Sequence, residues 1–299
     1  MDIALGPLLY YWPRDTVFQF YEAVAASPVH TVYLGEAVCS RRHELRSSDW
    51  LAIADKLAAA GKQVVLSTMT LIESGSDVVV LKKITGNGRF LVEANDFGAV
   101  HSLQKQVAFV AGPHLNLYNL PALEMVTRLG AKRWVTPLEM NRDDLAFMQN
   151  GRPLGLETEV FAYGRMPLAF SARCFTARHH NLPKDDCRFS CIEYPDGLLL
   201  ETKESQHFLV LNGIQTQSAL VYNLIGEIDD MRALGVSMVR ISPQSQHTLD
   251  IVKLFDAVIK GEMKSDVALE RMKPLMPDGA CNGYWYGKPG LEYTQAAAA

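Results

Sequence analysis

Four of the five cysteines in this chain have the types and spacing of ligands to a shared metal centre. Cys174, Cys187 and Cys191 lie within eighteen residues, and the turn-prone segment between the first two allows the chain to fold back. Cys39 is far away in the sequence, and it must be brought to the other three by the fold. Thiolates are soft ligands that bind zinc and iron-sulfur clusters. The first hypothesis is therefore a metal centre at Cys39, Cys174, Cys187 and Cys191.

The N-terminal sequence bears on the cellular compartment in which these thiols are found. Asp2 stands where a signal peptide needs a basic segment, and Gly6 and Pro7 interrupt the apolar stretch that follows. No run in the sequence approaches the roughly 18 apolar residues of a membrane span. We therefore expect a cytoplasmic protein without an integral membrane segment, in which cysteines stay reduced and are available to metals.

The cysteine spacing favours an iron-sulfur cluster over zinc. Structural zinc commonly uses two short cysteine pairs, whereas here one Cys-x3-Cys pair is joined by two separated cysteines, a dispersed pattern that iron-sulfur proteins also use. Two alternatives remain at this point: a structural zinc ion, and thiols that are merely buried as small apolar side chains. For Cys281, in a Gly- and aromatic-rich segment, we favour the packed, unligated thiol.

Composition and charge limit the class of protein. With 299 residues, 48% of them hydrophobic, the chain can bury a large core as one big domain or two ordinary ones. A formal net charge of -4 argues against a general nucleic-acid binder, which would concentrate basic residues. The terminal residues 296–299 are expected to be a tail without patterned information.

Short apolar runs rich in β-branched residues alternate with stretches of helical spacing along most of the chain. Strands are predicted at 3–6, 31–35, 63–67, 89–93, 108–111, 133–137, 159–162 and 238–241. The helix candidates between them include 16–26, 48–60, 121–129 and 222–234. Ser48 and Asn119 are placed to begin two of these helices, and Gly61, Gly130 and Gly235 to end three.

Eight strand-helix units predict an α/β fold, a TIM-like (β/α)8 barrel, with an open doubly wound sheet as the alternative. The first strand is not followed by the Gly-x-Gly-x-x-Gly pattern of a dinucleotide fold. The seventh and eighth strands are separated by far more than a helix and its loops. We expect a single barrel domain over 1–295, with an insertion at 164–217 that carries three cysteines and extra strands.

Chemistry in a barrel gathers where the strands end at their carboxyl termini. Cys39 follows the second strand and Cys174 lies beyond the seventh, so both can reach that face. Arginines there could hold a dicarboxylate through forked hydrogen bonds, although ordinary salt bridging at the rim is the alternative for each residue. The candidate substrate residues are Glu36, Asn116, Glu139, Arg165 and Arg173, and further rim candidates are Glu93, Asn95, Asp96 and His114.

Larger pieces of the sequence resemble a known family. Segments 159–174, 116–119 and 132–140 resemble the cysteine-bearing signature and neighbouring strands of the collagenase-like peptidases, family thirty-two of the unassigned peptidases. The resemblance covers nearly the whole chain. Segments 212–217 and 281–285 are most similar to the branch of this family that serves ubiquinone biosynthesis, and that similarity implies a 4Fe-4S cluster on Cys39, Cys174, Cys187 and Cys191.

The same resemblance implies a function and partners. It points to oxygen-independent hydroxylation of a ubiquinone precursor by a heterodimer with UbiU, itself a cluster protein. The lipid-binding protein UbiT, or another carrier of the precursor, would be an accessory, and prephenate would donate the oxygen. Relatives that hydroxylate RNA suggest an alternative, which the low basicity weakens. A zinc-stabilised interaction protein is a third possibility.

This chain departs from the family pattern at one position. The usual signature carries another cysteine shortly before the one matched by Cys174, and Met166 and Pro167 stand there instead. Cys39 would have to replace that ligand. Ligation by four cysteines leaves no iron open to substrate, so the cluster is expected to transfer electrons or support the structure.

We do not expect proteolysis. The sequence has neither His-Glu-x-x-His nor Gly-x-Ser-x-Gly. A cysteine nucleophile activated by His179 or His180 beside Cys174 is formally possible, but this histidine pair is better interpreted as a solvated loop or as support for the cluster.

Overall fold

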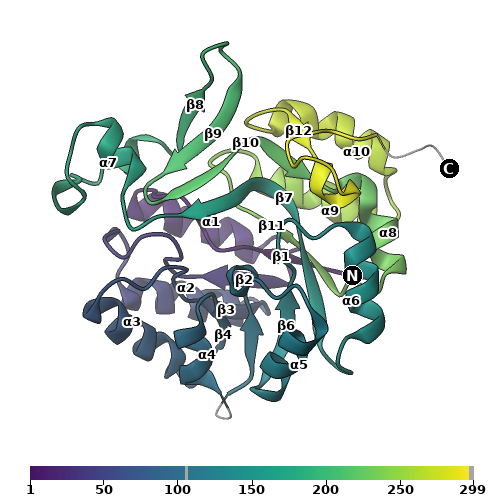
Figure 1. Ribbon diagram of the computed structural model, residues 1–299, viewed down its shortest axis with the longest axis horizontal. Coiled ribbons are helices and arrows are strands. Elements are labelled where there is room, and N and C mark those ends of the chain that lie inside the picture. Colours follow the sequence, from purple (N-terminus) through teal and green to yellow (C-terminus); the bar gives the residue numbers. More distant parts are fainter. Residues whose placement is uncertain (105–106, 296–299) are drawn as a thin grey trace.

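The computed structural model describes residues 1–104 and 107–295, and its centre is a closed barrel of eight parallel strands (Figure 1). In sheet order, each strand pairs in parallel with the next, and the last pairs with both β1 and β7 to close the ring. The eight strands are β1 (Asp2–Leu5), β2 (Thr31–Leu34), β3 (Gln63–Ser67), β4 (Leu91–Ala94), β5 (Phe109–Ala111), β6 (Ala131–Val135), β7 (Glu157–Phe170) and β11 (Met238–Ile241). The predicted barrel and all eight of its strands are confirmed, and the open sheet is excluded.

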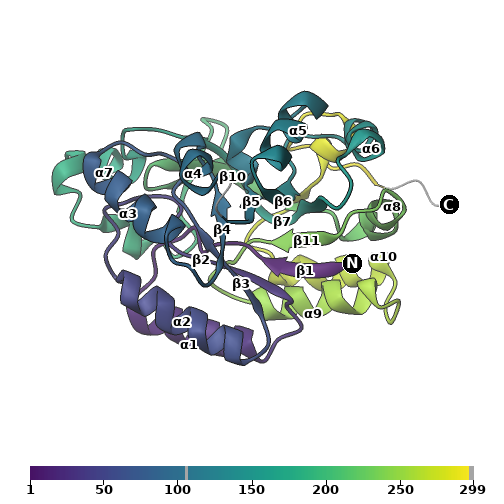
Figure 2. The same ribbon diagram turned by 90° about the horizontal axis from the view of Figure 1, so that it is seen from below.

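Helices follow the strands around the outside of the barrel. They are α1 (Arg14–Ala25), α2 (Ser47–Ala59), α3 (Gly75–Thr85), α4 (Phe97–Leu103), α5 (Leu120–Arg128), α6 (Arg142–Gly151), α8 (Ile228–Ala233), α9 (Thr248–Ile259) and α10 (Ser265–Met272). Figure 2 shows α1 and α2 packed together on one side, with α9 and α10 beside β1. Their apolar faces bury against the outside of the strands and form the main core.

Three predicted helices are confirmed to within two residues, but the prediction at 222–234 is wrong in its first half. Tyr222 and Asn223 end a long strand, β10 (Gln215–Asn223), which pairs with β7 and, through Tyr222, with β12 (Ala280–Cys281). Helix α8 begins only at Ile228, after a 3-10 turn. The apolar residues in this stretch fit both the helical and the strand periodicity. The first residues form a strand because they pair with neighbouring strands.

Strand β7 is much longer than predicted, because it continues past the barrel and becomes the base of the insertion. Beyond Gly164 it pairs antiparallel with β10, which pairs with β9 (His207–Asn212), and β9 pairs with the edge strand β8 (Leu198–Glu201). Helix α7 (Phe175–His179) lies between β7 and β8. The predicted insertion at 164–217 thus contains the extra strands, although β10 runs past its end. The predicted tail, 296–299, lies outside the described residues.

The inside of the barrel holds charged groups as well as apolar ones. Its apolar layer consists of Ala4, Tyr33, Val65, Val110, Val135 and Met238. Arg240 lies among them and donates hydrogen bonds to Glu93 at 2.7 Å and Glu159 at 2.5 Å. The Tyr33 hydroxyl donates to the other oxygen of Glu159. Each buried charge therefore has an opposite charge beside it, which compensates for its loss of water.

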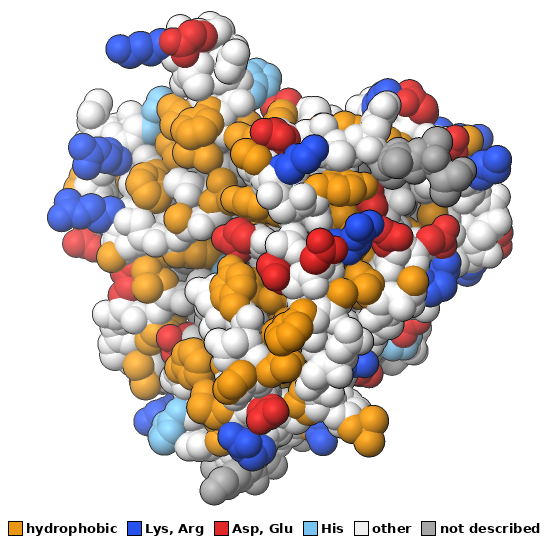
Figure 3. All heavy atoms as spheres, turned by 45° about the vertical axis from the view of Figure 1, so that its right-hand side comes forward, with side chains coloured by type: hydrophobic (Ala, Val, Ile, Leu, Met, Phe, Trp, Pro, Cys, Tyr) orange, Lys and Arg blue, Asp and Glu red, His pale blue; other side chains and the backbone are white. Residues whose placement is uncertain are grey.

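No helix among residues 1–104 and 107–295 is long and apolar enough to cross a membrane. On the face drawn in Figure 3, Lys and Arg side chains are interspersed with Asp and Glu, and hydrophobic side chains lie between them. This face does not carry the broad basic patch that a nucleic-acid site would need.

Candidate functional site

Cys39 is held in the loop after β2 by a carboxylate. Glu36 Oε1 accepts hydrogen bonds from the backbone N–H groups of Val38, at 2.9 Å, and Cys39, at 3.0 Å. Burial raises the pKa of Glu36, and the neighbouring Arg42 opposes that rise. Glu36 was predicted as a substrate residue, and the structure places it as the group that shapes the Cys39 loop.

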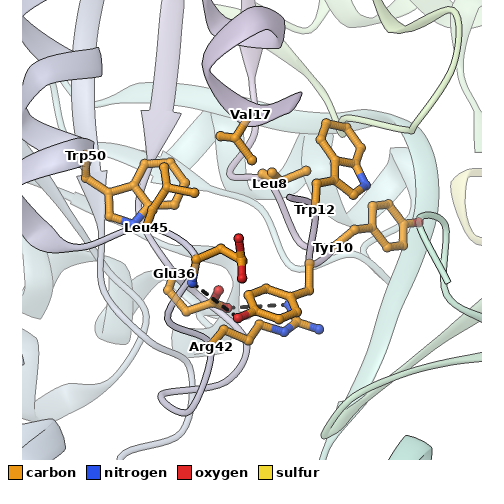
Figure 4. Close-up of a pocket in the computed structure, with 10 residues that line it drawn as sticks. Leu8, Tyr10, Trp12, Val17, Glu36, Arg42, Leu45 and Trp50 are labelled. Atoms are coloured by element: carbon orange, nitrogen blue, oxygen red, sulfur yellow. Dashed lines mark hydrogen bonds and ion pairs between the residues drawn. The ribbon is translucent and has the colours of Figure 1, made fainter. Parts of the chain in front are cut away.

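Arg42 is a buried cation beside the cysteines, and sequence reasoning missed it. Its guanidinium donates to the Leu9 carbonyl at 2.6 Å and to Asn212 Oδ1 at 2.7 Å, and it pairs with Glu36 at 3.6 Å (Figure 4). It also lies beside the sulfurs of Cys39 and Cys191, so the charge of each thiolate would raise the pKa of the guanidinium. A buried cation in this position favours negative charge on sulfur.

The turn between β9 and β10 positions Cys174. Gly213, with a φ of 66°, donates its N–H to Thr176 Oγ1 at 3.0 Å and accepts from the Phe175 N–H at 2.8 Å. These bonds fix the start of α7, where the Cys174 sulfur accepts from the Ala177 N–H at 3.4 Å. Asn212, in the same turn, is bonded to Arg42. The turn therefore joins the Cys174 helix to the Cys39 loop.

Cys187 and Cys191 belong to a loop that packs on the segments after β1 and β2. Between them, Arg188 and Phe189 both have left-handed backbones, with φ of 49° and 55°, which are uncommon for side chains of this size. The Phe189 ring contacts Tyr11 at 6.2 Å and His43 at 5.9 Å between ring centroids. These contacts come from the loops after β1 and β2, so all four cysteines lie at the carboxyl end of the barrel.

Three of the four sulfurs lie in one partly buried neighbourhood. Cys39 and Cys174 pack against a small buried cluster of Leu9, Ala37, Val38 and Ile214. The charge of Cys174 would act on both Cys39 and Cys191. Burial raises the pKa of Cys39 to about 11 and also raises that of Cys191. As the side chains stand, no three His, Cys, Asp or Glu groups in the described ranges are close enough to hold a metal ion.

The donor chemistry of this neighbourhood suits thiolate ligation. Soft sulfur ligands, a largely apolar lining and one buried guanidinium are the surroundings in which an iron-sulfur cluster or zinc is held. Cys281 does not belong to it. That thiol is buried in β12 within the main core, where burial raises its pKa to about 12.

Beside the cysteines, the mouth of the barrel contains a pocket of about 400 Å³. The predicted residues His114, Asn116 and Glu139 all line it, and so does Arg240, which sequence reasoning missed. Glu139 accepts a hydrogen bond from the Tyr118 hydroxyl at 2.8 Å. Burial lowers the pKa of His114 to about 4, so this imidazole is neutral at pH 7.

The other rim candidates have local structural partners. Glu93 is buried inside β4, and although burial opposes it, Arg240, Ser67 and Asn95 hold its pKa below the usual value. Asp96 caps α4. Arg165 is buried in β7 and donates to the carbonyls of Ala219 and Asp196. Only Arg173, directly before Cys174, is exposed on the rim.

A larger groove of about 740 Å³ lies outside the barrel, between α2 and α3. Its lining is mostly apolar and includes Trp50, Leu51 and Val80, and the Cys39 loop reaches its rim through Ser40 and His43. Of the predicted site residues, only Glu36 lines this groove. The predicted chemistry is therefore concentrated at the mouth pocket and the cysteines.

Residues 17–295 match the sequence model of the family described as peptidase family U32. The chain belongs to peptidase family U32. This confirms the family resemblance carried by segments 116–119, 132–140 and 159–174. The finer resemblance to the ubiquinone-related branch remains a prediction.

Solved structures of low identity include one member of the U32 family. The U32 peptidase Mk0906 is 12% identical and matches over 82% of this chain and 93% of its own, with a TM-score of 0.46. The dihydrodipicolinate synthase DapA-2 from Bacillus anthracis is 9% identical over 91% and 80% of the two chains, with a TM-score of 0.49. The barrel assignment rests on the strand pairing and not on these similarities.

The structure locates the residues at which this chain departs from the expected family signature. Met166 is buried and Pro167 lines the mouth pocket. Cys39 packs with Cys174 on the buried cluster that includes Leu9 and Ile214. The histidines do not form a catalytic pair with Cys174 in the described residues. His180 Nε2 is instead 3.0 Å from the Tyr194 hydroxyl.

Proposed function

We propose that this U32 protein is a UbiV-like iron-sulfur component of oxygen-independent hydroxylation in ubiquinone biosynthesis. The observation that carries the proposal is that Cys39 and Cys191 lie beside the buried Arg42, with Cys174 near both of these cysteines, at the carboxyl end of a barrel. Cys187, in the same loop as Cys191, would supply the fourth thiolate of the proposed set. The bound 4Fe-4S cluster would supply electron transfer or structural support, because four cysteines leave no iron free for substrate.

The chain's own residues have distinct parts in this proposal. Glu36 shapes the Cys39 loop through two backbone hydrogen bonds, and the Gly213 turn holds the Cys174 helix. Arg42 balances the negative charge of the thiolates. Prephenate, as the oxygen donor, and the quinone precursor carried by UbiT are the small molecules that we propose for the whole system.

We also propose a heterodimer with UbiU, with the edge strand β8 as the docking surface. Leu199 and Leu200 on the edge strand β8 and Phe208 on its neighbour β9 are exposed. An edge strand offers unpaired backbone groups to a partner, and exposed large apolar side chains beside it favour such a contact. Co-expression with tagged UbiU tests this surface. Leu200→Glu should abolish co-purification without changing the melting temperature, and Val79→Glu on α3 should leave co-purification intact. Equal recovery of UbiU with both variants would refute the surface.

Metal identity tests the proposed cofactor. Anaerobic purification, followed by absorbance and EPR spectroscopy and by iron and sulfide assays, should give about four of each per chain. A colourless protein that carries one zinc ion per chain would refute the cluster proposal. Deletion of the gene should stop ubiquinone formation only under anaerobic growth. Unchanged ubiquinone together with altered RNA hydroxylation would instead indicate that the protein acts in RNA hydroxylation.

A further inference from the structure

The mouth pocket and the cysteine neighbourhood share one side chain, Phe170. This residue, at the end of β7, lines the pocket together with Pro167. It also packs against the buried cluster of Leu9, Ala37, Val38 and Ile214, on which Cys39 and Cys174 pack as well. Phe170 therefore belongs both to the lining of the pocket and to the apolar surroundings of the two cysteines.

The floor of the pocket offers a hydrogen-bond donor without excess positive charge. Arg240 uses Nε and Nη2 to bind Glu159 and Glu93, whose carboxylates together offset its charge. Its third nitrogen, Nη1, has no hydrogen-bond partner in the described part of the chain, and Arg240 lines the pocket. Such a group suits an oxygen atom with partial or single negative charge better than a multiply charged anion.

The walls favour a flat ring. Phe161 and Phe170 present aromatic surface to the pocket, and Pro113 and Pro167 add rigid apolar surface. Between these, the uncharged polar groups of Thr136, Asn116 and the neutral His114 can donate or accept hydrogen bonds. A volume of about 400 Å³ is in the range of small-molecule sites.

We propose that this pocket binds a small six-membered ring bearing hydroxyl, keto or carboxylate oxygen, with one oxygen on Arg240 Nη1 and the ring against Phe161 and Phe170. The proposal rests on the proposed function, since it makes this chain the subunit that holds a ring substrate beside the cysteines. Binding itself requires no cluster.

Calorimetric titration of the full chain with three probes tests the pocket: phenol, benzoate and 4-hydroxybenzoate. At least one probe should bind, and its identity distinguishes a hydroxyl on Arg240 from a carboxylate. Leu138→Trp, which fills the pocket without touching the Arg240 network, should weaken binding at least about tenfold, or ~1.4 kcal/mol. Val80→Trp, in the groove between α2 and α3, is the matched control and should leave binding unchanged.

Two outcomes would overturn the inference: no binding of any ring probe, or equal loss in Leu138→Trp and Val80→Trp. Citrate serves as an acid without a ring, and binding equal to that of the ring probes would also overturn it. The same titration on the Cys39→Ala chain separates this inference from the proposed function. Ring binding by a protein without iron supports the pocket alone, whereas iron and sulfide without ring binding supports the cluster alone.

Discussion

The ring of His114 meets the ring of Phe170 edge to face, with 4.9 Å between their centroids. His114 comes from the turn after β5, whereas Phe170 ends the extension of β7, so the contact ties the barrel to its insertion. Burial of the imidazole lowers the pKa of His114 to about 4. Both rings line the mouth pocket, and Phe170 also packs against the buried cluster on which Cys39 and Cys174 pack.

This depressed pKa predicts a pH-dependent stability. The unfolded chain binds a proton at His114 near pH 6.5 and the folded chain only near pH 4. The contribution is therefore fully present above pH 6.5 and is lost progressively as the pH falls from 6.5 towards 4. His114→Gln should flatten the fall in melting temperature between pH 7 and pH 5, whereas His101→Gln, at an exposed position, should not. Parallel pH profiles for wild type and His114→Gln would contradict the assignment.

Cys39 is the ligand that this chain would use in place of the cysteine missing from the U32 signature. We expect Cys39→Ala to lose most of its iron and sulfide after anaerobic purification, because three thiolates cannot complete the set. Cys281→Ala removes a thiol from the main core and should retain the full content. A complete cluster in Cys39→Ala would refute the idea that Cys39 replaces the ligand missing near Pro167, even if the chain binds iron.

Arg42 should matter for folding even in the metal-free protein. Arg42→Met leaves Glu36, the Leu9 carbonyl and Asn212 without their buried partner, and the free energy of unfolding should fall by about 3–5 kcal/mol. Urea denaturation measures this change. Arg46→Met, at an exposed position of the same loop, should stay within about 0.5 kcal/mol of wild type.

The coupling between Arg42 and Glu36 can be measured separately. Adding Glu36→Gln to Arg42→Met should cost less than the sum of the single changes, because each charge is expensive to bury only when the other is absent. Strict additivity of the two free-energy changes would mean that the ion pair contributes nothing.

Gly164 marks the place where β7 leaves the barrel. Its φ is 131°, and a Cβ there would lie 2.5 Å from Ser242 Cβ in the segment after β11. Gly164→Ala should therefore destabilise the fold by at least about 1–3 kcal/mol, through crowding and a backbone that side chains rarely adopt. Gly226→Ala faces open space and is the matched control. Equal melting temperatures for the two variants would show that the close approach is not required.

The strands were predictable because each is a short apolar run bounded by turn residues, and helices separated them. The buried charges were not predictable. Glu93 and Arg240 look like surface residues in the sequence, and only closure of the ring brings β4, β7 and β11 together around them. Arg42 was missed for a similar reason, since its partners Leu9 and Asn212 are 203 positions apart in the sequence. The helix prediction at 222–234 failed because Tyr222 pairs with two strands at once.

The pairing of β1 with β11 has a consequence for the order of assembly. These strands are far apart in the sequence, since Asp2 pairs with Met238, so the ring closes through contacts of very long sequence separation, which are slow to form. The Cys39 loop and the Cys174 helix meet across the turn at Gly213, and Leu9, which follows β1, completes the setting of Arg42. The thiol site is therefore a product of the finished barrel, and loading of the proposed cluster would follow folding.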